Sequence, residues 1–174
     1  LRDAVAAVVD FERLRAMTTG PRLFVSATNV RSGRLREFRH HEITLDAVMA
    51  SACLPMLFRA VAIGDEHYWD GGYLGNPSLL PLIAESPAQD LLLVQLNPSH
   101  RASVPATAQA IVERVNETTF NASLVKELRS VALLKRALAT SGARGAAAEP
   151  ALFSQIAALR LHRIDGGAAL EQLG

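Results

Sequence analysis

The chain has 174 residues, of which 49% are hydrophobic and 20% charged, enough apolar side chains to build the core of one domain. Its formal net charge of +1 gives no electrostatic basis for binding nucleic acid, and its single cysteine excludes an internal disulfide. No apolar run approaches the roughly 18 residues of a membrane-spanning helix, and no signal peptide is visible. These features favour a cytoplasmic or membrane-peripheral protein.

The first 60 residues predict two helices with two strands between them. Apolar residues at helical spacing predict an amphipathic helix over residues 1–17. The apolar run "RLFVSATNV" predicts a buried strand, and the alternating "RLREFRH" after it predicts an exposed one. Thr44 is expected to cap a second helix, which should end before Pro55.

The middle of the chain predicts a hairpin, a buried strand and a long helix. Gly64-Asp65-Glu66 between "AVAI" and "HYW" is typical of a β-hairpin. The uninterrupted apolar run "DLLLVQL" predicts a strand buried on both faces. Residues 105–139 then carry two apolar stripes, one along Ile111 and Val115 and one along Leu124 and Val131, a pattern typical of a helix buried against two neighbours.

The C-terminal part predicts a flexible small-residue linker over 142–148, followed by a short helix and a strand in an extension over 149–174. Strands alternating with helices indicate an α/β layered fold. The chain begins with Leu and stops where a helix has barely begun, so we expect it to be part of a longer protein.

Most residue types that carry chemistry have an ordinary structural interpretation here. His40 and His41 are adjacent, so on a strand they would point to opposite faces, and no third metal ligand lies at suitable spacing. Cys53 follows an apolar helix face, which is typical of an inert buried thiol. Ser26 and Ser51 do not lie in a Gly-x-Ser-x-Gly elbow, and no phosphate-binding or dinucleotide motif is present. Neither a metal nor an organic cofactor is therefore expected.

Two Asp-Gly-Gly tripeptides are candidates for a functional turn, Asp70-Gly71-Gly72 and Asp165-Gly166-Gly167. Either can be a plain turn, because Asp and Gly are common turn residues. Asp165 leads into a generic helix start. Asp70, in "YWDGGYLGNP", lies between aromatic residues after a hairpin, and two glycines there would let the backbone approach another element closely. Asp70 is therefore the stronger candidate.

An ordered series of segments resembles the patatin-like phospholipases, which are serine lipid acyl hydrolases. "LFVSATNVRSGRLREFRH" is similar to the strand and hairpin that follow the family's nucleophile region, and "DAVMASACLPMLFRAV" to its Ala-Ser-x-x-x-Pro-x-x-Phe segment. "YWDGG" resembles its Asp-Gly-Gly/Ala motif. "QLNPS" and the helix containing "ERVNETTFNASLVKELRSV" resemble a bacterial branch. The resemblance covers residues 10–140 and continues weakly beyond them.

The resemblance implies a three-layer fold with a central, mainly parallel sheet, of which residues 1–174 form an incomplete C-terminal portion. It implies a Ser–Asp dyad in which Asp70 is the catalytic aspartate. The family's oxyanion loop and Gly-x-Ser-x-Gly elbow precede the matching segments and are not in this sequence. The expected partners are a lipid or acyl-ester substrate, a membrane surface for peripheral contact, and an N-terminal part of the same protein that carries the nucleophile.

These expectations define an enzyme of the phospholipase A or lysophospholipase type when intact, whereas the segment alone should be inactive. The alternative is a non-catalytic interaction domain on a patatin scaffold, with the long helix as a docking face. An upstream Gly-x-Ser-x-Gly elbow would favour the enzyme, and its absence would favour the interaction domain.

Overall fold

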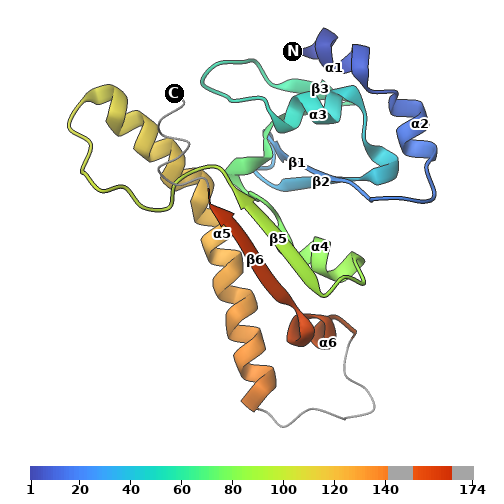
Figure 1. The fold of residues 1–174 in the computed structure, drawn as a ribbon. Coiled ribbons are helices and arrows are strands. Elements are labelled where there is room, and N and C mark those ends of the chain that lie inside the picture. Colours follow the sequence, from blue (N-terminus) through green and yellow to red (C-terminus); the bar gives the residue numbers. More distant parts are fainter. Residues whose placement is uncertain (141–150, 166–174) are drawn as a thin grey trace. The chain divides into compact units, whose positions relative to one another are not determined.

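The computed structural model describes residues 1–140 and 151–165, and the chain divides into two compact units, Leu1–Pro77 and Ser78–Gly174. The elements of the first unit are shown in Figure 1. They are α1 (Arg2–Val8), α2 (Phe11–Ala16), β1 (Phe24–Asn29), β2 (Leu35–Arg39), the 3₁₀ turn η1 (His40–Glu42), α3 (Leu45–Ser51), β3 (Val61–Ile63), β4 (Glu66–Asp70) and the 3₁₀ turn η2 (Gly71–Tyr73).

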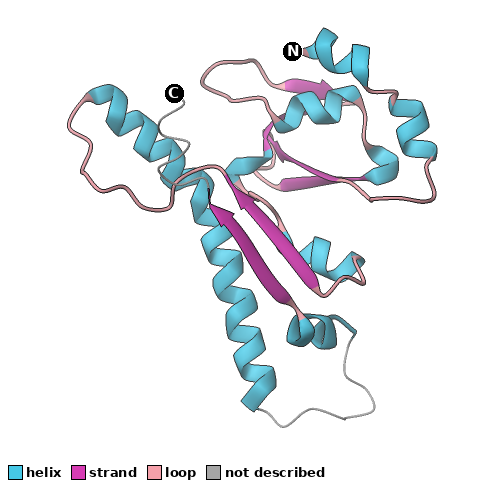
Figure 2. Cartoon of the chain, viewed as in Figure 1, coloured by secondary structure: helices cyan, strands magenta, loops and turns pink. Residues whose placement is uncertain are grey.

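The first unit is built on an antiparallel four-stranded sheet with the order β2-β1-β4-β3. Strands are coloured magenta in Figure 2. Two tight turns set this topology. Gly33 and Gly64 adopt positive φ angles of 63° and 60° in the β1–β2 and β3–β4 connections, a conformation that glycine reaches without a steric penalty. In the first turn the Asn29 side chain also accepts a hydrogen bond from the Ser32 N–H at 2.8 Å.

Helix α3 packs on this sheet to form the core of the first unit. Its buried residues Ala47 and Ala50 are small, which lets the helix lie close to the strands. Phe38 and Tyr68 meet edge to face in the same core, with their ring centroids 5.7 Å apart. The predicted cap is confirmed, because the Thr44 side chain accepts a hydrogen bond from the Ala47 N–H at 3.1 Å.

The prediction of one helix over residues 1–17 is wrong. Val9 is extended, with φ −117° and ψ 117°, and it separates α1 from α2. Asp10 then caps the second helix by accepting a hydrogen bond from the Arg13 N–H at 2.9 Å. A capping aspartate inside the apolar pattern therefore starts a new helix in place of continuing the first.

The second unit consists of α4 (Leu79–Glu85), β5 (Asp90–Gln95), α5 (Ala108–Thr140), α6 (Ala151–Ala158) and β6 (Arg160–Asp165). Strands β5 and β6 pair in parallel, from Asp90 opposite Arg160 to Gln95 opposite Asp165. The core of this unit gathers residues from α4, β5, α5 and α6, together with the residue between α6 and β6: Leu79, Ile83, Leu93, Leu124, Val131, Ile156 and Leu159.

The sheet topology corrects part of the predicted fold class. The expectation of mixed helix and sheet is confirmed, but the four-stranded sheet is antiparallel, and among the described strands parallel pairing is found in β5 and β6. The three-layer arrangement around a mainly parallel sheet is not confirmed. The hairpin turns explain the antiparallel pairs β1–β2 and β3–β4, since strands joined by short turns must run antiparallel, whereas β1 and β4 pair across a longer connection.

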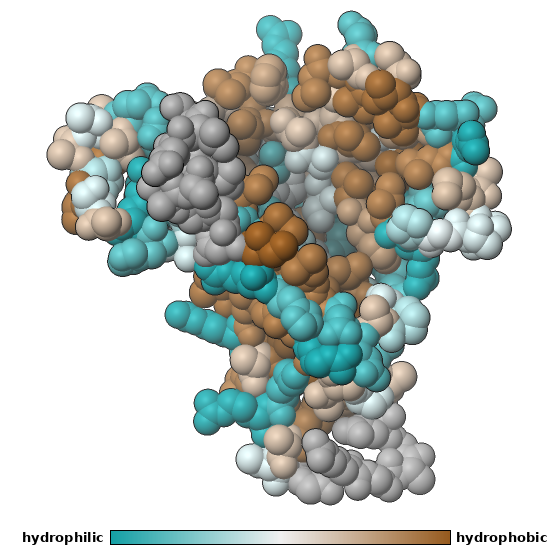
Figure 3. Space-filling model, in the orientation of Figure 1, coloured by the Kyte–Doolittle hydropathy of each residue, from teal (hydrophilic) through white to brown (hydrophobic). Residues whose placement is uncertain are grey.

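Two burial predictions are also wrong in the described structure. Strand β5 is not buried on both faces, because Leu92 and Val94 are each 59% exposed. Of the two stripes on α5, the one with Leu124 and Val131 packs into the core, whereas Ile111 and its neighbours on the other stripe are exposed. Hydrophobic residues are accordingly visible at the surface in Figure 3. The predicted linker over 142–148 lies outside the described residues.

Candidate functional site

Asp70 is the last residue of β4 and the N-cap of the 3₁₀ turn η2. Its Oδ1 atom accepts a hydrogen bond from the Gly72 N–H at 2.8 Å. This is the local cap that a plain Asp-Gly-Gly turn would have, so the contact alone does not distinguish a structural from a catalytic aspartate. A carboxylate has a second oxygen, however, and Oδ2 can still accept a proton while Oδ1 holds the turn.

The main chain of Asp70 is held from two sides. Its N–H donates to the carbonyl oxygen of Cys53, just after α3, at 2.9 Å. Its carbonyl oxygen accepts a hydrogen bond from the Thr28 hydroxyl on β1 at 2.8 Å. The carboxylate is therefore attached to a backbone position that both the sheet and the end of α3 define.

Gly71 lies against the backbone of β1. A Cβ atom added to Gly71 would be 2.3 Å from the Ser26 carbonyl oxygen and 2.7 Å from the Ser26 Cβ. No side chain fits at that distance, so a close approach requires glycine here. The sequence predicted a close backbone approach at these glycines, and the structure places β1 of the same chain against Gly71.

Burial raises the pKa of the Asp70 carboxyl above its usual range, and the hydrogen bond from the Gly72 N–H offsets part of that shift. The charge of Asp70 acts on two neighbouring groups. Burial raises the pKa of the Cys53 thiol and of the Tyr73 hydroxyl, and the negative charge of Asp70 raises both further. A half-buried carboxylate with a raised pKa is a better proton acceptor than a solvated one.

The two aromatic neighbours of Asp70 differ in their relation to it. Tyr73 lies at the other end of η2 and is close enough for the Asp70 charge to affect its pKa. Trp69 precedes Asp70 on β4, so its side chain points to the opposite face of the strand. Its indole N–H is buried and has no hydrogen-bond partner in the described structure. Of these two aromatic residues, Tyr73 is therefore the one whose ionisation the Asp70 charge affects.

Two other candidates from the sequence, Cys53 and Ser26, are neighbours of this turn, since the Cys53 carbonyl oxygen accepts the Asp70 N–H and Ser26 lies against Gly71. His40 and His41 form part of η1, not of a strand as predicted, because the chain leaves β2 at Arg39. Cys53 is buried, and its thiol donates to the Arg59 carbonyl at 3.1 Å, as expected of an inert thiol. Among the described residues, no group of three His, Cys, Asp or Glu side chains is placed to hold a metal ion.

The second Asp-Gly-Gly tripeptide belongs to the other unit. Asp165 ends β6, where its backbone pairs with Gln95, and Gly166 and Gly167 lie outside the described residues. Sequence reasoning did not single out Thr28 or Ser26 as neighbours of Asp70. Their one signal was the position of both residues in the strand "RLFVSATNV", whose pairing with β4 cannot be read from the sequence.

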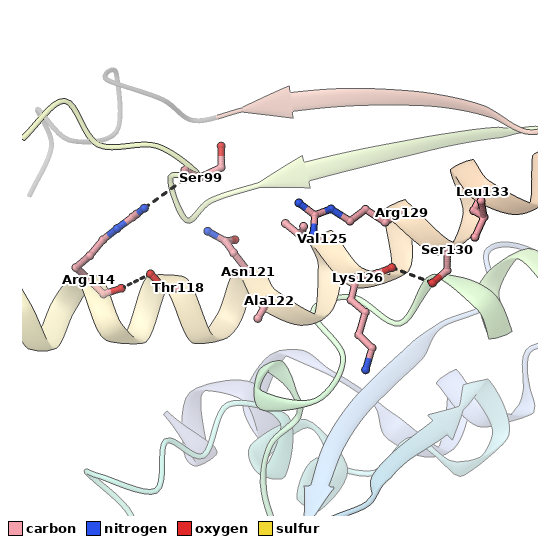
Figure 4. Close-up of a pocket in the computed structure, with 10 residues that line it drawn as sticks. All are labelled: Ser99, Arg114, Thr118, Asn121, Ala122, Val125, Lys126, Arg129, Ser130 and Leu133. Carbon is pink, nitrogen blue, oxygen red and sulfur yellow. Dashed lines mark hydrogen bonds between the residues drawn. The ribbon is translucent and has the colours of Figure 1, made fainter. Parts of the chain in front are cut away.

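A cavity of about 580 Å³ lies along α5 in the second unit (Figure 4). Its lining combines apolar residues such as Val125 with cationic side chains such as Arg114 and Arg129. Arg114 is already engaged, because it forms an ion pair with Glu117 at 3.0 Å and donates to the Pro98 and Ser99 carbonyls. The cavity is therefore bounded by α5 and by the loop after β5.

The segment thus combines helices and strands and carries a half-buried aspartate, Asp70, on a glycine turn. Hydrogen bonds with Thr28 on β1 and with Cys53 after α3 hold the backbone of that turn in place. Residues 1–83 match the family model of patatin-like phospholipases. This range contains β1, α3 and the Asp70 turn, and the match confirms the family that the sequence motifs indicated for this part of the chain. No curated protein matches the chain.

The match has a consequence at the level of the family. Patatin-like phospholipases generally comprise lipid acyl hydrolases, so the match indicates lipid hydrolysis as the family-level activity. The substrate class that this implies is a lipid. No helix among residues 1–140 and 151–165 has the length and apolar character that crossing a membrane requires.

Proposed function

We propose that the chain is the C-terminal portion of the catalytic domain of a serine lipid acyl hydrolase, of the phospholipase A or lysophospholipase type. Asp70 is the proposed base of a Ser–Asp dyad. The nucleophilic serine and the oxyanion loop belong to an N-terminal part of the same protein, because none of the 174 residues forms a Gly-x-Ser-x-Gly elbow. The proposed substrates are fatty acyl esters of phospholipids or related lipids, met by peripheral contact with a membrane surface.

The observation that supports this proposal best is that Asp70 is half-buried, has a raised pKa and has its backbone held by hydrogen bonds. An ordinary Asp, with a pKa near 3.9, is too weak a base to activate a serine hydroxyl efficiently at neutral pH. Burial raises the pKa of Asp70, and the hydrogen bonds of its backbone restrict its position. The same residue lies inside the range that matches the family model. A surface turn that served only as a connection would need neither the burial nor the two backbone contacts.

The proposed reaction has two steps. In the first, the serine oxygen attacks the acyl carbonyl carbon while the Asp70 carboxylate takes the serine proton, and the ester C–O bond breaks as the leaving alcohol receives that proton. In the second, water attacks the acyl-serine and gives its proton to Asp70. The fatty acid then leaves, and the proton returns to the serine oxygen.

The alternative is a non-catalytic interaction domain that uses α5 as its docking face. One observation favours it: the exposed stripe of α5 carries Ile111 and Val115, which are 46% and 58% exposed. Apolar side chains at helical spacing on an exposed face are typical of helices that bind partners. The alternative requires no activated serine, so chemical labelling separates the two functions.

A fluorophosphonate probe tests the proposed function, because it modifies only serine residues that a base activates. The intact protein should be labelled on a serine N-terminal to this segment, and mass spectrometry would identify the peptide. The segment of residues 1–174 alone should not be labelled. Absence of labelling in the intact, folded protein would contradict the enzyme and favour the interaction domain.

A further inference from the structure

We infer that Thr28 is a positioning residue for Asp70, and this inference rests on the proposed function. The Thr28 hydroxyl donates a hydrogen bond to the Asp70 carbonyl oxygen at 2.8 Å. Thr28 does not touch the carboxylate itself. Its proposed role is to fix the peptide unit between Asp70 and Gly71, and through it the direction of the Asp70 side chain.

Thr28 lies where the pairing of β1 and β4 brings it beside the turn. On β1, Ala27 is opposite Asp70 and Thr28 is opposite Trp69. A threonine at this point of a strand has a stiff χ1 angle, so its hydroxyl has few alternative directions. The hydrogen bond therefore joins a rigid side chain on the sheet to the residue at which β4 ends.

The backbone of Asp70 is bonded outside the ordinary strand ladder. Its N–H donates to the Cys53 carbonyl at the end of α3, and its carbonyl is held by a side chain. The next residues are Gly71 and Gly72, which have more conformational freedom than any other residue type. A hydrogen bond on the Asp70 carbonyl is therefore well placed to limit rotation of the peptide unit that leads into this buried glycine pair.

The orientation of the carboxylate depends on this peptide unit. Oδ1 accepts a hydrogen bond from the Gly72 N–H, so the position of Gly72 fixes one carboxylate oxygen. If the Asp70–Gly71 peptide rotated, the Gly72 N–H would move relative to Oδ1. The other carboxylate oxygen, Oδ2, would then turn away from the serine hydroxyl of the proposed dyad. Small displacements of a catalytic group reduce rate strongly, so the predicted effect is on turnover.

The test compares Thr28→Val and Thr28→Ser in the intact protein with a p-nitrophenyl acyl ester. Valine keeps the shape of the side chain but cannot donate a hydrogen bond, whereas serine restores the hydroxyl. We expect Thr28→Val to lower kcat by about 10-fold or more with KM within about twofold, since misplacing a catalytic group by 1 Å can lower the rate by roughly 10²-fold. Thr28→Ser should recover most of kcat.

Thr119→Val is a matched control for the loss of a threonine hydroxyl. Thr119 on α5 also donates to a backbone carbonyl at 2.8 Å, that of Val115. It should leave kcat unchanged. A merely structural role for Thr28 would lower the thermal midpoint of Thr28→Val without changing the kcat of the folded enzyme. Wild-type kcat in Thr28→Val, or equal loss in the Val and Ser variants, would overturn the inference.

Asp70→Asn separates a failure of this inference from a failure of the proposed function. If Asp70→Asn retains wild-type kcat, the proposed dyad is wrong whatever Thr28 does. If Asp70→Asn is inactive and Thr28→Val is unaffected, the dyad stands and the positioning role is wrong. If Thr28 acts through Asp70, the double variant should be no slower than Asp70→Asn alone.

Discussion

Gly71 lies so close to Ser26 that a side chain at residue 71 would meet the Ser26 carbonyl oxygen at 2.3 Å. This contact within the chain explains why the residue directly after Asp70 is a glycine. The sequence suggested only that these glycines let the backbone approach another element closely. In the structure, Gly71 already serves to bring the Asp70 turn against β1.

Gly71→Ala should destabilise the first unit more than Gly64→Ala. At Gly71 the new Cβ would collide with backbone, and overpacking of this kind typically costs about 1–3 kcal/mol or more. At Gly64 no atom lies within 4 Å of the added Cβ, but the φ of 60° costs a non-glycine residue about 1–2 kcal/mol. Urea denaturation of both variants measures the difference. Equal or greater loss in Gly64→Ala would contradict the close contact.

Asp70→Asn should stabilise the fold near neutral pH. Because the folded-state pKa of Asp70 is raised, its charged form destabilises the folded state above that pKa, and the effect disappears below the unfolded pKa of about 3.9. Asparagine removes the charge and can still accept the Gly72 hydrogen bond. The thermal midpoint of the variant should therefore exceed that of the wild type at pH 7, and the two should converge near pH 3.

Glu42→Gln should show the opposite pH dependence. The Arg39 backbone N–H lowers the pKa of Glu42 most, and the Arg36 guanidinium lowers it further. A lowered folded-state pKa contributes stability above the unfolded pKa of about 4.3, and this contribution is lost as the pH falls through the folded-state value. Glu42→Gln should therefore be less stable than the wild type at pH 7. A deficit that persists unchanged at pH 2 would contradict this assignment.

Glu127→Ala should destabilise the second unit by about 1 kcal/mol, the usual loss for a helix N-cap. The Glu127 carboxylate on α5 accepts hydrogen bonds from the Leu79 N–H at 2.6 Å and the Leu80 N–H at 3.3 Å, at the start of α4. Glu113→Ala, an exposed acidic residue on the same helix, should change stability by less than about 0.5 kcal/mol. Equal losses in the two variants, measured by denaturation, would show that Glu127 is not a cap.

Local signals in the sequence predicted the local structure well. Thr44 caps α3, and Gly64 turns the β3–β4 hairpin. Each of these features depends on residues a few positions apart, whose propensities act within one turn.

Long-range pairing could not be predicted in the same way. The mainly parallel sheet came from the family resemblance, whereas β1 in fact pairs with both β2 and β4 in antiparallel fashion. The hydrogen bond from Thr28 to Asp70 joins residues 42 positions apart, and no local pattern specifies such a contact. The apolar run of β5 likewise predicts a hydrophobic strand but not which of its faces other elements cover, so it does not predict the exposure of Leu92 and Val94.

The central claim is that Asp70 is the catalytic base, and the kcat of Asp70→Asn in the intact protein tests it most directly. Asparagine keeps the size of the side chain but cannot take the serine proton, so kcat should fall by on the order of 10²–10⁴-fold on an acyl-ester substrate. Asp165→Asn, the matched change in the second tripeptide, should have little effect. The thermal midpoint must show that both variants are folded. A folded Asp70→Asn protein with near-normal kcat would contradict the account.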